Sequence, residues 1–346
     1  MLRNILRQQV IRLRQFFNLG TKLSTWLVTG GAGYIGAHVV NSLINKDFKV
    51  IVVDDLSTGL ERKIPKSAIF EKLNTANTKE LTAVLTKHRV EGVIHLAAKK
   101  AVGESMINPS LYYQENIGGL ISLLEAMSKA NVKKIVYSSS AAVYGTPKED
   151  KVSENSETNP QSPYGETKLV GEWLLKADEK ARQIKWIALR YFNVVGAANP
   201  ELGDTGVNNL VPMVFRALQN NERPKVFGDD YPTKDGSCIR DYIDVSDLAD
   251  AHVIAAQKLA TENYCGIINI GRGEGFSVKE VMNTISEVIG KDVNYEISPR
   301  RAGDPAQTIA DVTKSSNDLK WKAQSDLKSM INSAWQAWQL MPPSTK

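Results

Sequence analysis

The sequence contains little cysteine and no long apolar run. Cys238 and Cys265 are the only two cysteines among 346 residues, and they form no CxxC motif and no cluster with metal-site spacing. We therefore expect no metal site, two structural thiols, and a reducing compartment such as the cytoplasm. No uninterrupted apolar stretch approaches the roughly 18–20 residues that a spanning helix needs, so a membrane-embedded protein is not expected.

A basic excess is also missing from most of the chain. The formal net charge is +5, but residues 1–22 hold five basic residues and no acidic one, which leaves 38 basic against 38 acidic residues in the rest. This balance does not favour a nucleic-acid surface. The basic segment 1–22 has apolar residues at roughly helical spacing. It suits a membrane-surface helix, a targeting peptide or a dispensable extension.

Short apolar runs alternate with amphipathic stretches from Ser24 to about residue 197. The runs are continuous and β-branched, which is typical of parallel strands covered on both faces. We predict strands at 26–30, 49–55, 92–98, 133–140 and 186–193. We predict helices at 37–46, 78–88 and 120–130. Strand–helix–strand alternation of this kind predicts a Rossmann-type, doubly wound parallel α/β sheet.

The pattern changes after residue 197 to loops rich in Gly, Pro, Asn and Asp, with scattered helices. We therefore divide the chain into the extension 1–22, a Rossmann domain at 23–197, and a smaller mixed α/β domain at 198–346. One late apolar run at 266–271 is a candidate strand that returns to the main sheet.

A glycine-rich loop follows the first predicted strand and opens a helix. Gly30, Gly33 and Gly36 in "TGGAGYIGAH" allow a tight turn and a close approach of the backbone to a pyrophosphate at the helix N-terminus. The second strand ends in Asp54, 18 residues beyond Gly36, near the usual position of a carboxylate that binds a ribose 2′-hydroxyl. A carboxylate there disfavours a 2′-phosphate, so the loop predicts NAD rather than NADP.

A tyrosine and a lysine lie four residues apart in two places, so the spacing alone indicates nothing. Tyr144 and Lys148 enclose Gly145 and Pro147, which predict a turn. Tyr164 and Lys168, in contrast, follow Ser162 and Pro163, a plausible N-cap and first helical residue.

The second pair therefore lies on a predicted helix. Val170, Trp173, Leu174 and Ala177 then form an apolar face on it at i, i+3, i+4 and i+7 spacing.

These motifs resemble those of a known family. The segments "SSSAAVYG" (138–145), "SPYGETK" (162–168) and "RYFNVVGA" (190–197) resemble the extended short-chain dehydrogenase/reductase family. Within it, "AAKKAVGES" (97–105), "NNLVP" (208–212), "VFGDDYPTKDGSCIRDYIDVSDLA" (226–249) and "RRAGDPA" (300–306) resemble the UDP-glucose 4-epimerases. The similarity runs from about Leu27 to Trp338.

The resemblance implies roles for individual residues. Tyr164 would be the catalytic base, Lys168 would hold the nicotinamide ribose and lower the tyrosine pKa, and Ser140 would hydrogen-bond the reacting hydroxyl. The implied NAD-binding residues are Gly30, Gly33, Tyr34, Ile35, Gly36, Asp54, Asp55, Asn74, Leu96, Ala97, Ala98, Lys100, Asn116, Ser138, Tyr164, Lys168 and Phe192. The implied nucleotide-sugar residues are Ser140, Tyr164, Asn193, Asn209, Leu210, Phe227, Arg240, Arg301 and Asp304.

Some positions depart from the family pattern. Asn74 stands where the family usually has an aspartate against the adenine, and Leu96 and Ala98 replace a common Phe and Gly. Ala141 and Ala142 stand where related 4,6-dehydratases carry an Asp-Glu pair, so elimination of water is disfavoured. Thr308 lies near a position that limits space around the sugar C2 substituent. Its small size predicts turnover of UDP-N-acetylhexosamines as well.

The resemblance thus implies a 4-epimerase that interconverts UDP-glucose and UDP-galactose with tightly bound NAD. Two alternatives stay open: another NAD-dependent nucleotide-sugar enzyme, such as a reductase or decarboxylase, and a non-catalytic NAD- or UDP-sugar-binding regulator. The family usually forms homodimers. Here the helices around 111–130 and 162–180 would supply the contact.

Overall fold

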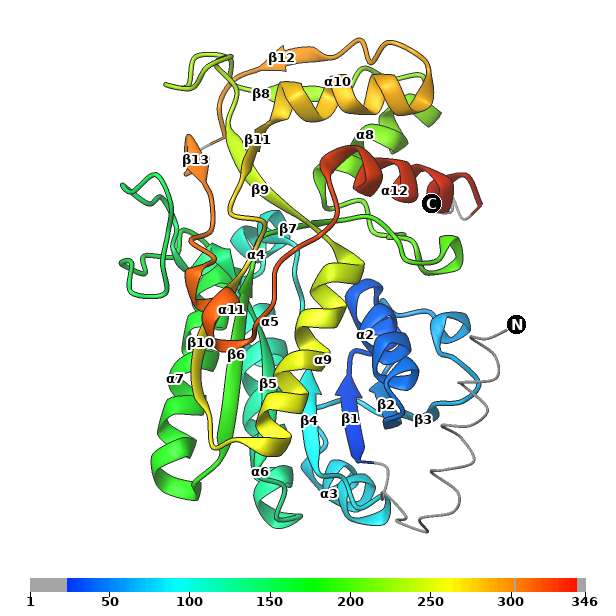
Figure 1. Cartoon of the computed structure of the whole chain (residues 1–346), viewed down its shortest axis with the longest axis vertical. Helices are drawn as coiled ribbons and strands as arrows, with labels where there is room; N and C mark the ends of the chain where they lie inside the picture. The colour runs from blue at the N-terminus through cyan, green and yellow to red at the C-terminus, as the bar shows by residue number, and fades with distance from the viewer. Residues whose placement is uncertain (1–23, 302, 341–346) are drawn as a thin grey trace, which may run out of the picture.

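The structure, a computed structural model, describes residues 24–301 and 303–340. In Figure 1 a larger lower part surrounds a central sheet, and a smaller upper part consists mainly of later segments. The basic segment 1–22 lies outside the described residues, so its interpretations stay predictions. Among the described helices, none is both long and apolar enough to cross a membrane.

A seven-stranded parallel sheet forms the centre of the lower part. Its strand order is β10-β6-β5-β4-β1-β2-β3. The strands are β1 (Thr25–Thr29), β2 (Lys49–Asp54), β3 (Ile69–Lys72), β4 (Gly92–His95), β5 (Lys134–Ser140), β6 (Lys185–Tyr191) and β10 (Cys265–Ile270). The winding reverses between β1 and β4, which opens a crevice for ligands at their carboxyl ends. The predicted doubly wound sheet and the returning strand at 266–271 are confirmed.

Helices cover both faces of this sheet, which explains why its strands are apolar without interruption. Val28 and Val52 pack toward α2 and α9, whereas Leu27, Ile51 and Val53 pack toward the opposite face. The first face is covered by α2 (Tyr34–Asn45) and α9 (Val245–Thr261). The opposite face is covered by α3 (Thr78–Lys87), α6 (Gly119–Lys129) and α7 (Pro163–Arg182).

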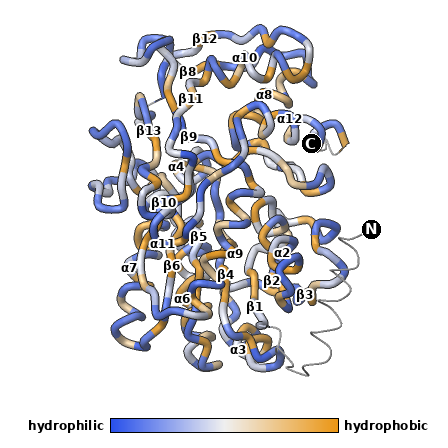
Figure 2. Tube along the Cα trace, in the orientation of Figure 1, coloured by the Kyte–Doolittle hydropathy of each residue, from blue (hydrophilic) through white to orange (hydrophobic). Residues whose placement is uncertain are grey.

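The upper part has its own core. Its strands are β7 (Asn193–Val195), β8 (Lys225–Phe227), β9 (Ile239–Asp244), β11 (Gly275–Ser277), β12 (Glu296–Ser298) and β13 (Gln307–Thr308). Its helices are α8 (Leu210–Gln219), α10 (Val278–Ile289), α12 (Leu327–Leu340) and the one-turn η4 (Pro200–Leu202). The Phe215 ring packs against Trp335 and Trp338, with centroids 5.0 and 5.7 Å away. Figure 2 shows hydrophobic and hydrophilic residues alternating along α10, whose apolar side faces this core.

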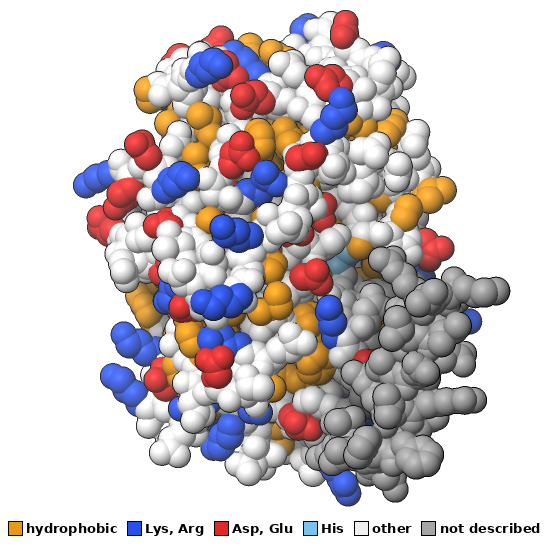
Figure 3. All heavy atoms as spheres, viewed as in Figure 1, with side chains coloured by type: hydrophobic (Ala, Val, Ile, Leu, Met, Phe, Trp, Pro, Cys, Tyr) orange, Lys and Arg blue, Asp and Glu red, His pale blue; other side chains and the backbone are white. Residues whose placement is uncertain are grey.

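Short elements complete the described chain. They are η1 (Glu61–Lys63), α4 (Val102–Ile107), α5 (Pro109–Tyr112), the π-helix η2 (Tyr113–Gly118), η3 (Ala141–Val143) and α11 (Thr313–Asp318). On the face drawn in Figure 3, acidic and basic side chains are interspersed, without a large area of one sign.

Several elements differ from the sequence prediction, including β4, which ends at His95 rather than at residue 98. The predicted strand 186–193 ends at Tyr191, and Asn193–Val195 forms the separate strand β7, which pairs with β9. The edge strand β3 has only four residues, too few for a clear pattern. Helix α9 joins the lower part although it lies beyond residue 197, because it packs against α2.

The predicted helix that begins after Ser162 is confirmed as α7, and its buried face is the one that carries Tyr164. Trp173 is 60% exposed and Ala177 is exposed, whereas Tyr164, Lys168 and Leu175 are buried. Leu169 and Leu175 are buried on this side together with polar side chains. These polar groups can be buried because they have hydrogen-bond partners inside the protein, as Lys168 does at the Ser138 carbonyl.

Candidate active site

The glycine loop connects β1 to the first turn of α2. Gly30 has a φ of +70°, and a Cβ on Gly36 would lie 2.0 Å from the Gly30 carbonyl oxygen, so both positions require glycine. Gly33 caps α2 without any side-chain hydrogen bond to the first turn. The first-turn amides, including those of Tyr34 and Ile35, are therefore available to an anion.

Asp54 ends β2 beside this loop. Its carboxylate oxygens accept hydrogen bonds from the Ala32 amide at 3.0 Å and the Leu56 amide at 2.8 Å, and burial raises its pKa. A carboxylate has further lone pairs, so it can still accept bonds from ribose hydroxyls. The adjacent Asp55 accepts a bond from the Asn74 amide at 2.8 Å, which places Asn74 at the same edge.

The loop after β4 lies directly against the glycine loop. A Cβ on Gly30 would meet the Ala97 nitrogen at 2.7 Å, and the neighbouring Leu96 and Ala98 belong to the same turn. Lys100 is exposed, and its ammonium lies 5.8 Å from the centroid of the Tyr34 ring. The predicted NAD-binding residues of β1, β2 and β4 therefore gather at one edge of the sheet.

Asn116 lies behind this loop rather than at its surface. From the π-helix η2, its side chain accepts a bond from the Lys99 amide (2.7 Å) and donates to the Lys99 carbonyl (3.0 Å) and the Thr167 hydroxyl (3.0 Å). The structure thus gives Asn116 internal partners. It ties the 96–101 loop to α7, whatever further contact it makes with a cofactor.

Ser140, Tyr164 and Lys168 come together at the carboxyl end of β5. The Lys168 ammonium donates to the Ser138 carbonyl at 2.7 Å and lies 5.9 Å from the centroid of the Tyr164 ring. Ser162 caps α7 by accepting a bond from the Gly165 amide at 3.2 Å, as predicted. Tyr144, from the other Tyr-Lys pair with the same spacing, instead precedes a turn at Gly145 (φ +64°), and its hydroxyl donates to the Asn269 side chain.

Burial dominates the electrostatics of this trio. It lowers the pKa of Lys168 to about 7. Burial also raises the pKa of Tyr164, and the hydrogen bond with the Ser140 side chain offsets this increase only in part. Without an added positive charge the phenol therefore stays protonated. A cation bound against Tyr164 would favour the phenolate, and the oxidised nicotinamide ring of NAD carries such a positive charge.

The sequence analysis missed an ion pair that supports this trio. Glu172, one turn beyond Lys168, accepts bonds from Arg190 at 2.8 and 2.6 Å and from the Ser139 hydroxyl at 2.6 Å. The side chains of Glu172 and Arg190 are each only 3% exposed. A buried bidentate pair of this kind fixes α7 relative to β5 and β6. The only sequence signal was an acid on the same helical face as Lys168.

Two further predicted cofactor residues lie near the end of β5. Ser138 is buried and its hydroxyl bonds to the Tyr191 hydroxyl. Phe192 is buried in a small cluster with Val143, Tyr144 and Leu169. Both side chains therefore pack beneath the crevice at the carboxyl ends of the strands.

The predicted nucleotide-sugar residues line the upper part. Arg240 on β9 pairs with Asp304 at 2.9 Å, and β13 places the buried Thr308 in register with Arg240. The Arg301 guanidinium stacks on the Phe227 ring at 3.8 Å. These contacts form a cationic, partly aromatic surface, which suits a diphosphate and a base.

Asn193, Asn209 and Leu210 flank this surface. Asn193 is exposed at the start of β7, and Asn209 occupies the N-cap position of α8, directly before Leu210, without a side-chain capping bond. The Asn209 side chain donates to the Asp204 carboxylate at 2.9 Å.

The two groups of residues meet near the start of α7. A Cβ on Gly303, next to Asp304, would lie 3.7 Å from the Gln161 side chain, three residues before Tyr164. The amide of Val152 also donates to the Ile309 carbonyl at 2.9 Å, which anchors the segment after Thr308. Within the described residues, no group of three or more His, Cys, Asp or Glu side chains could hold a metal ion.

The chain has clear relatives. The profile of the NAD dependent epimerase/dehydratase family matches residues 26–271. A UDP-glucose 4-epimerase of Lactobacillus helveticus is 40% identical over 322 residues, which cover 92% of this chain and 97% of the relative.

Two solved structures share the fold. A UDP-glucose-4-epimerase from Stenotrophomonas maltophila with bound NAD and formylated UDP-arabinopyranose has a TM-score of 0.88 at 38% identity, covering 92% of this chain and 98% of that one. The UDP-Glc/GlcNAc 4-epimerase of Campylobacter jejuni has a TM-score of 0.81 at 36% identity, covering 92% and 99%. The glycine loop, Asp54 and the buried Tyr164–Lys168 pair fit the NAD of this family, and the chain belongs to the NAD-dependent epimerase/dehydratase family, among the UDP-glucose 4-epimerases.

Proposed function

We propose that this chain interconverts UDP-glucose and UDP-galactose by inverting C4 of the sugar. The observation that carries the proposal is the juxtaposition of Ser140, Tyr164 and Lys168 beside the glycine loop, with Ala141 and Ala142 directly after the serine. A base for a sugar hydroxyl is present, and these two positions carry no acid for elimination of water.

The residues act as follows in the proposed reaction. Tyr164 takes the proton of the 4-hydroxyl, and Ser140 holds that hydroxyl by a hydrogen bond. Bound NAD would supply the chemistry of hydride acceptance and return at C4, and Tyr164 would give the proton back to the C4 oxygen. Lys168 holds the ribose of the cofactor and stabilises the phenolate by its charge. Because Tyr164 is 8% exposed and Lys168 3%, little water competes for the proton.

The upper part would bind the nucleotide. We assign Arg240 and Arg301 to the diphosphate, Phe227 to the base and Asp304 to ribose hydroxyls. The support is their clustering and the geometric suitability of guanidinium groups for phosphate oxygens. The division into an NAD-binding domain at 23–197 and a nucleotide-sugar domain at 198–346 remains part of the proposal. Helix α9 and strand β10 are returns to the first domain.

Incubation with UDP-galactose and no added cofactor tests the function. We expect UDP-glucose to form without a change in absorbance at 340 nm, because each hydride returns to the sugar. Net NADH formation or consumption would indicate a reductase or decarboxylase, and binding without turnover would indicate a regulator. UDP-GlcNAc serves as a second substrate. The small side chain of Thr308 predicts detectable conversion, and its absence would overturn that part of the proposal.

We also propose a homodimer. Large hydrophobic side chains are exposed on neighbouring helices α4, α6 and α7, namely Met106 (61%), Ile107 (78%), Ile121 (48%) and Trp173 (60%). Such a patch is typical of a protein interface. We expect a dimer in sedimentation equilibrium and a monomer after Trp173→Glu, and a monomeric wild type would contradict the assignment.

Both cysteines are free thiols, which supports a cytoplasmic location.

A further inference from the structure

We propose that Tyr34, His38 and Lys63 form a clasp that positions the nucleotide-sugar segment 196–209 against the cofactor loops. The inference rests on the proposed function, and it assigns the three side chains a positioning role rather than a catalytic one. All three are buried, all three come from elements next to the predicted NAD site, and each hydrogen bonds to backbone of the same segment.

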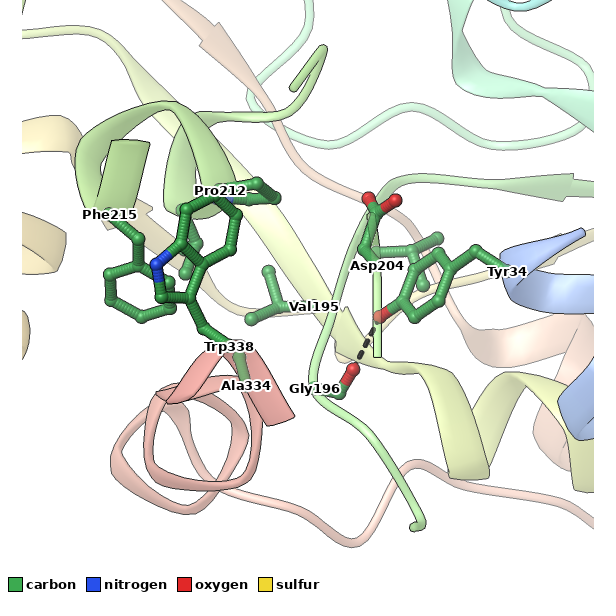
Figure 4. Close-up of a pocket in the computed structure, with 10 residues that line it drawn as sticks. Tyr34, Val195, Gly196, Asp204, Pro212, Phe215, Ala334 and Trp338 are labelled. Atoms are coloured by element: carbon green, nitrogen blue, oxygen red, sulfur yellow. Dashed lines mark hydrogen bonds between the residues drawn. The ribbon is translucent and has the colours of Figure 1, made fainter. Parts of the chain in front are cut away.

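The Tyr34 side chain reaches from the predicted NAD site to the segment after β7. Its backbone belongs to the first turn of α2, but its hydroxyl donates to the Gly196 carbonyl at 2.6 Å (Figure 4). Val195, Phe215 and Trp338 line the small cavity next to this bond. Asp204 also lines the cavity, but the Tyr34 side chain is buried, so little water competes for the bond, and the bond specifies one position of the segment.

His38 makes the second contact, one turn further along α2. Its Nδ1 lies 2.8 Å from the Tyr34 carbonyl oxygen, which can only accept, so Nδ1 carries the proton. Its Nε2 then accepts from the Ala198 amide at 3.1 Å. Burial lowers the pKa of His38 to about 4, so the neutral ring that this geometry requires is present at neutral pH.

Lys63 makes the third contact from the other cofactor loop. It lies in η1, a few residues after Asp54, and its ammonium donates to the Gly203 carbonyl at 2.6 Å. Its side chain is almost fully buried, which lowers the pKa of Lys63 to about 8, and the nearby Asp204 carboxylate offsets this decrease only in part. The elements that follow Gly30 and Asp54 therefore both hydrogen bond to the segment 196–209, at different points along it.

The gripped segment leads directly to substrate candidates. Gly196 follows β7, which pairs with β9, the strand that carries Arg240. At its other end, Asp204 accepts the hydrogen bond from Asn209. A shift of the segment would thus move Asn209 and the β7 edge relative to the cofactor loops. The clasp sets the distance between the two halves of the site.

Tyr34→Phe tests the clasp, because it removes one hydroxyl and keeps the backbone amide of the glycine loop. Tyr264→Phe is the matched control. It also removes a hydroxyl bonded to a partner, Asp318 at 2.7 Å, but directly before β10 and away from the segment. Affinity for UDP is measured by titration calorimetry on the NAD-containing proteins at 20 °C, together with the melting temperature, NAD content, KM and kcat.

We expect Tyr34→Phe to weaken UDP binding and raise KM by about two- to tenfold, the range that one buried neutral hydrogen bond represents. NAD content should stay at the wild-type level. Tyr264→Phe should lower the melting temperature by a similar amount and leave UDP affinity unchanged. If Tyr34→Phe changes only the melting temperature, its role is merely structural and the clasp is refuted.

Lys63 provides an independent arm if Tyr34→Phe fails to fold. Lys63→Met should weaken UDP binding, and Lys63→Gln, which keeps a donor for Gly203, should weaken it less. Equal affinity of both variants and the wild type would refute the clasp. Absence of epimerization in the wild type, with UDP binding intact, would refute the proposed function instead, and the UDP titrations would still decide on the clasp.

Discussion

The two halves of the site are built in different ways. The cofactor half depends on backbone: glycines that no other residue can replace, uncapped amides and short buried side chains at strand ends. The nucleotide-sugar half depends on long side chains that pair with one another across separate segments, as in Arg240–Asp304 and Arg301–Phe227. The first half therefore tolerates little change, whereas the second can lose single contacts gradually.

Burial differs in the same direction. Lys168 is 3% exposed and has no carboxylate at its ammonium in the described structure, where it donates to a carbonyl. The side chains of Arg240 and Asp304 are 13% and 28% exposed, and each offsets the charge of the other. In the cofactor half, the free-energy cost of burying the Lys168 charge is therefore not offset by a neighbouring carboxylate. In the nucleotide-sugar half, the charges of Arg240 and Asp304 offset each other.

Tyr164→Phe should show the largest effect. It removes the base while keeping the ring, so we expect kcat to fall by about 10²- to 10⁴-fold, the usual contribution of general acid–base catalysis. The NAD content should change little. Turnover of UDP-galactose, measured by coupled assay, checks the prediction.

Tyr144→Phe is the matched control. Tyr144 belongs to the other Tyr-Lys pair, Tyr144 and Lys148, and its hydroxyl bonds to Asn269 at 2.6 Å. Its turnover at a temperature below its melting point should stay within a few-fold of the wild type. Equal losses in both variants would remove the distinction between the two Tyr-Lys pairs.

Lys168→Met should stabilise the protein while lowering its activity by less than Tyr164→Phe does. Burial lowers the Lys168 pKa from 10.5 to about 7, so the folded state binds fewer protons than the unfolded state between these values. Stability contributed by the wild-type lysine therefore rises with pH through this window and is lowest below pH 7. After loss of the hydrogen bond to Ser138, we expect a net gain of about 2–3 kcal/mol at pH 6.

Urea denaturation of the nucleotide-stripped proteins from pH 6 to 10 checks this. The gain of Lys168→Met over the wild type should shrink steadily as the pH rises. A gain that does not depend on pH would show that Lys168 is not destabilised by burial of its charge.

Arg240→Met should have the smallest effect of the three. The loss of one charge-assisted contact to a diphosphate predicts about a tenfold or somewhat larger rise in KM for UDP-galactose, with kcat reduced less. Arg223→Met is the control, since Arg223 is exposed and bonds to Asn294 at 3.1 Å. A wild-type KM for Arg240→Met would remove Arg240 from the binding surface.

The sequence alone predicted most of the cofactor half of the site and less of the nucleotide-sugar half. The glycine loop, Asp54 and the helix start at Ser162–Pro163 are local patterns, so they could be placed without knowing the rest of the chain. The burial of Glu172 on α7 could not be predicted, because its partner Arg190 lies on strand β6. Asn116 was assigned to the cofactor, but its bonds to Lys99 and Thr167 depend on the π-turn of η2.

What the sequence by itself determined was the parallel sheet, the NAD loop and the Tyr-Lys helix, because turns, caps and strand runs depend on residues only a few positions apart. The tertiary structure decided that α9 returns to the first sheet, that Arg240 meets Asp304, and that the Tyr34 hydroxyl reaches Gly196. These contacts join residues 64 or 162 positions apart for the two side-chain bonds. They depend on how whole elements pack, which local sequence patterns do not specify.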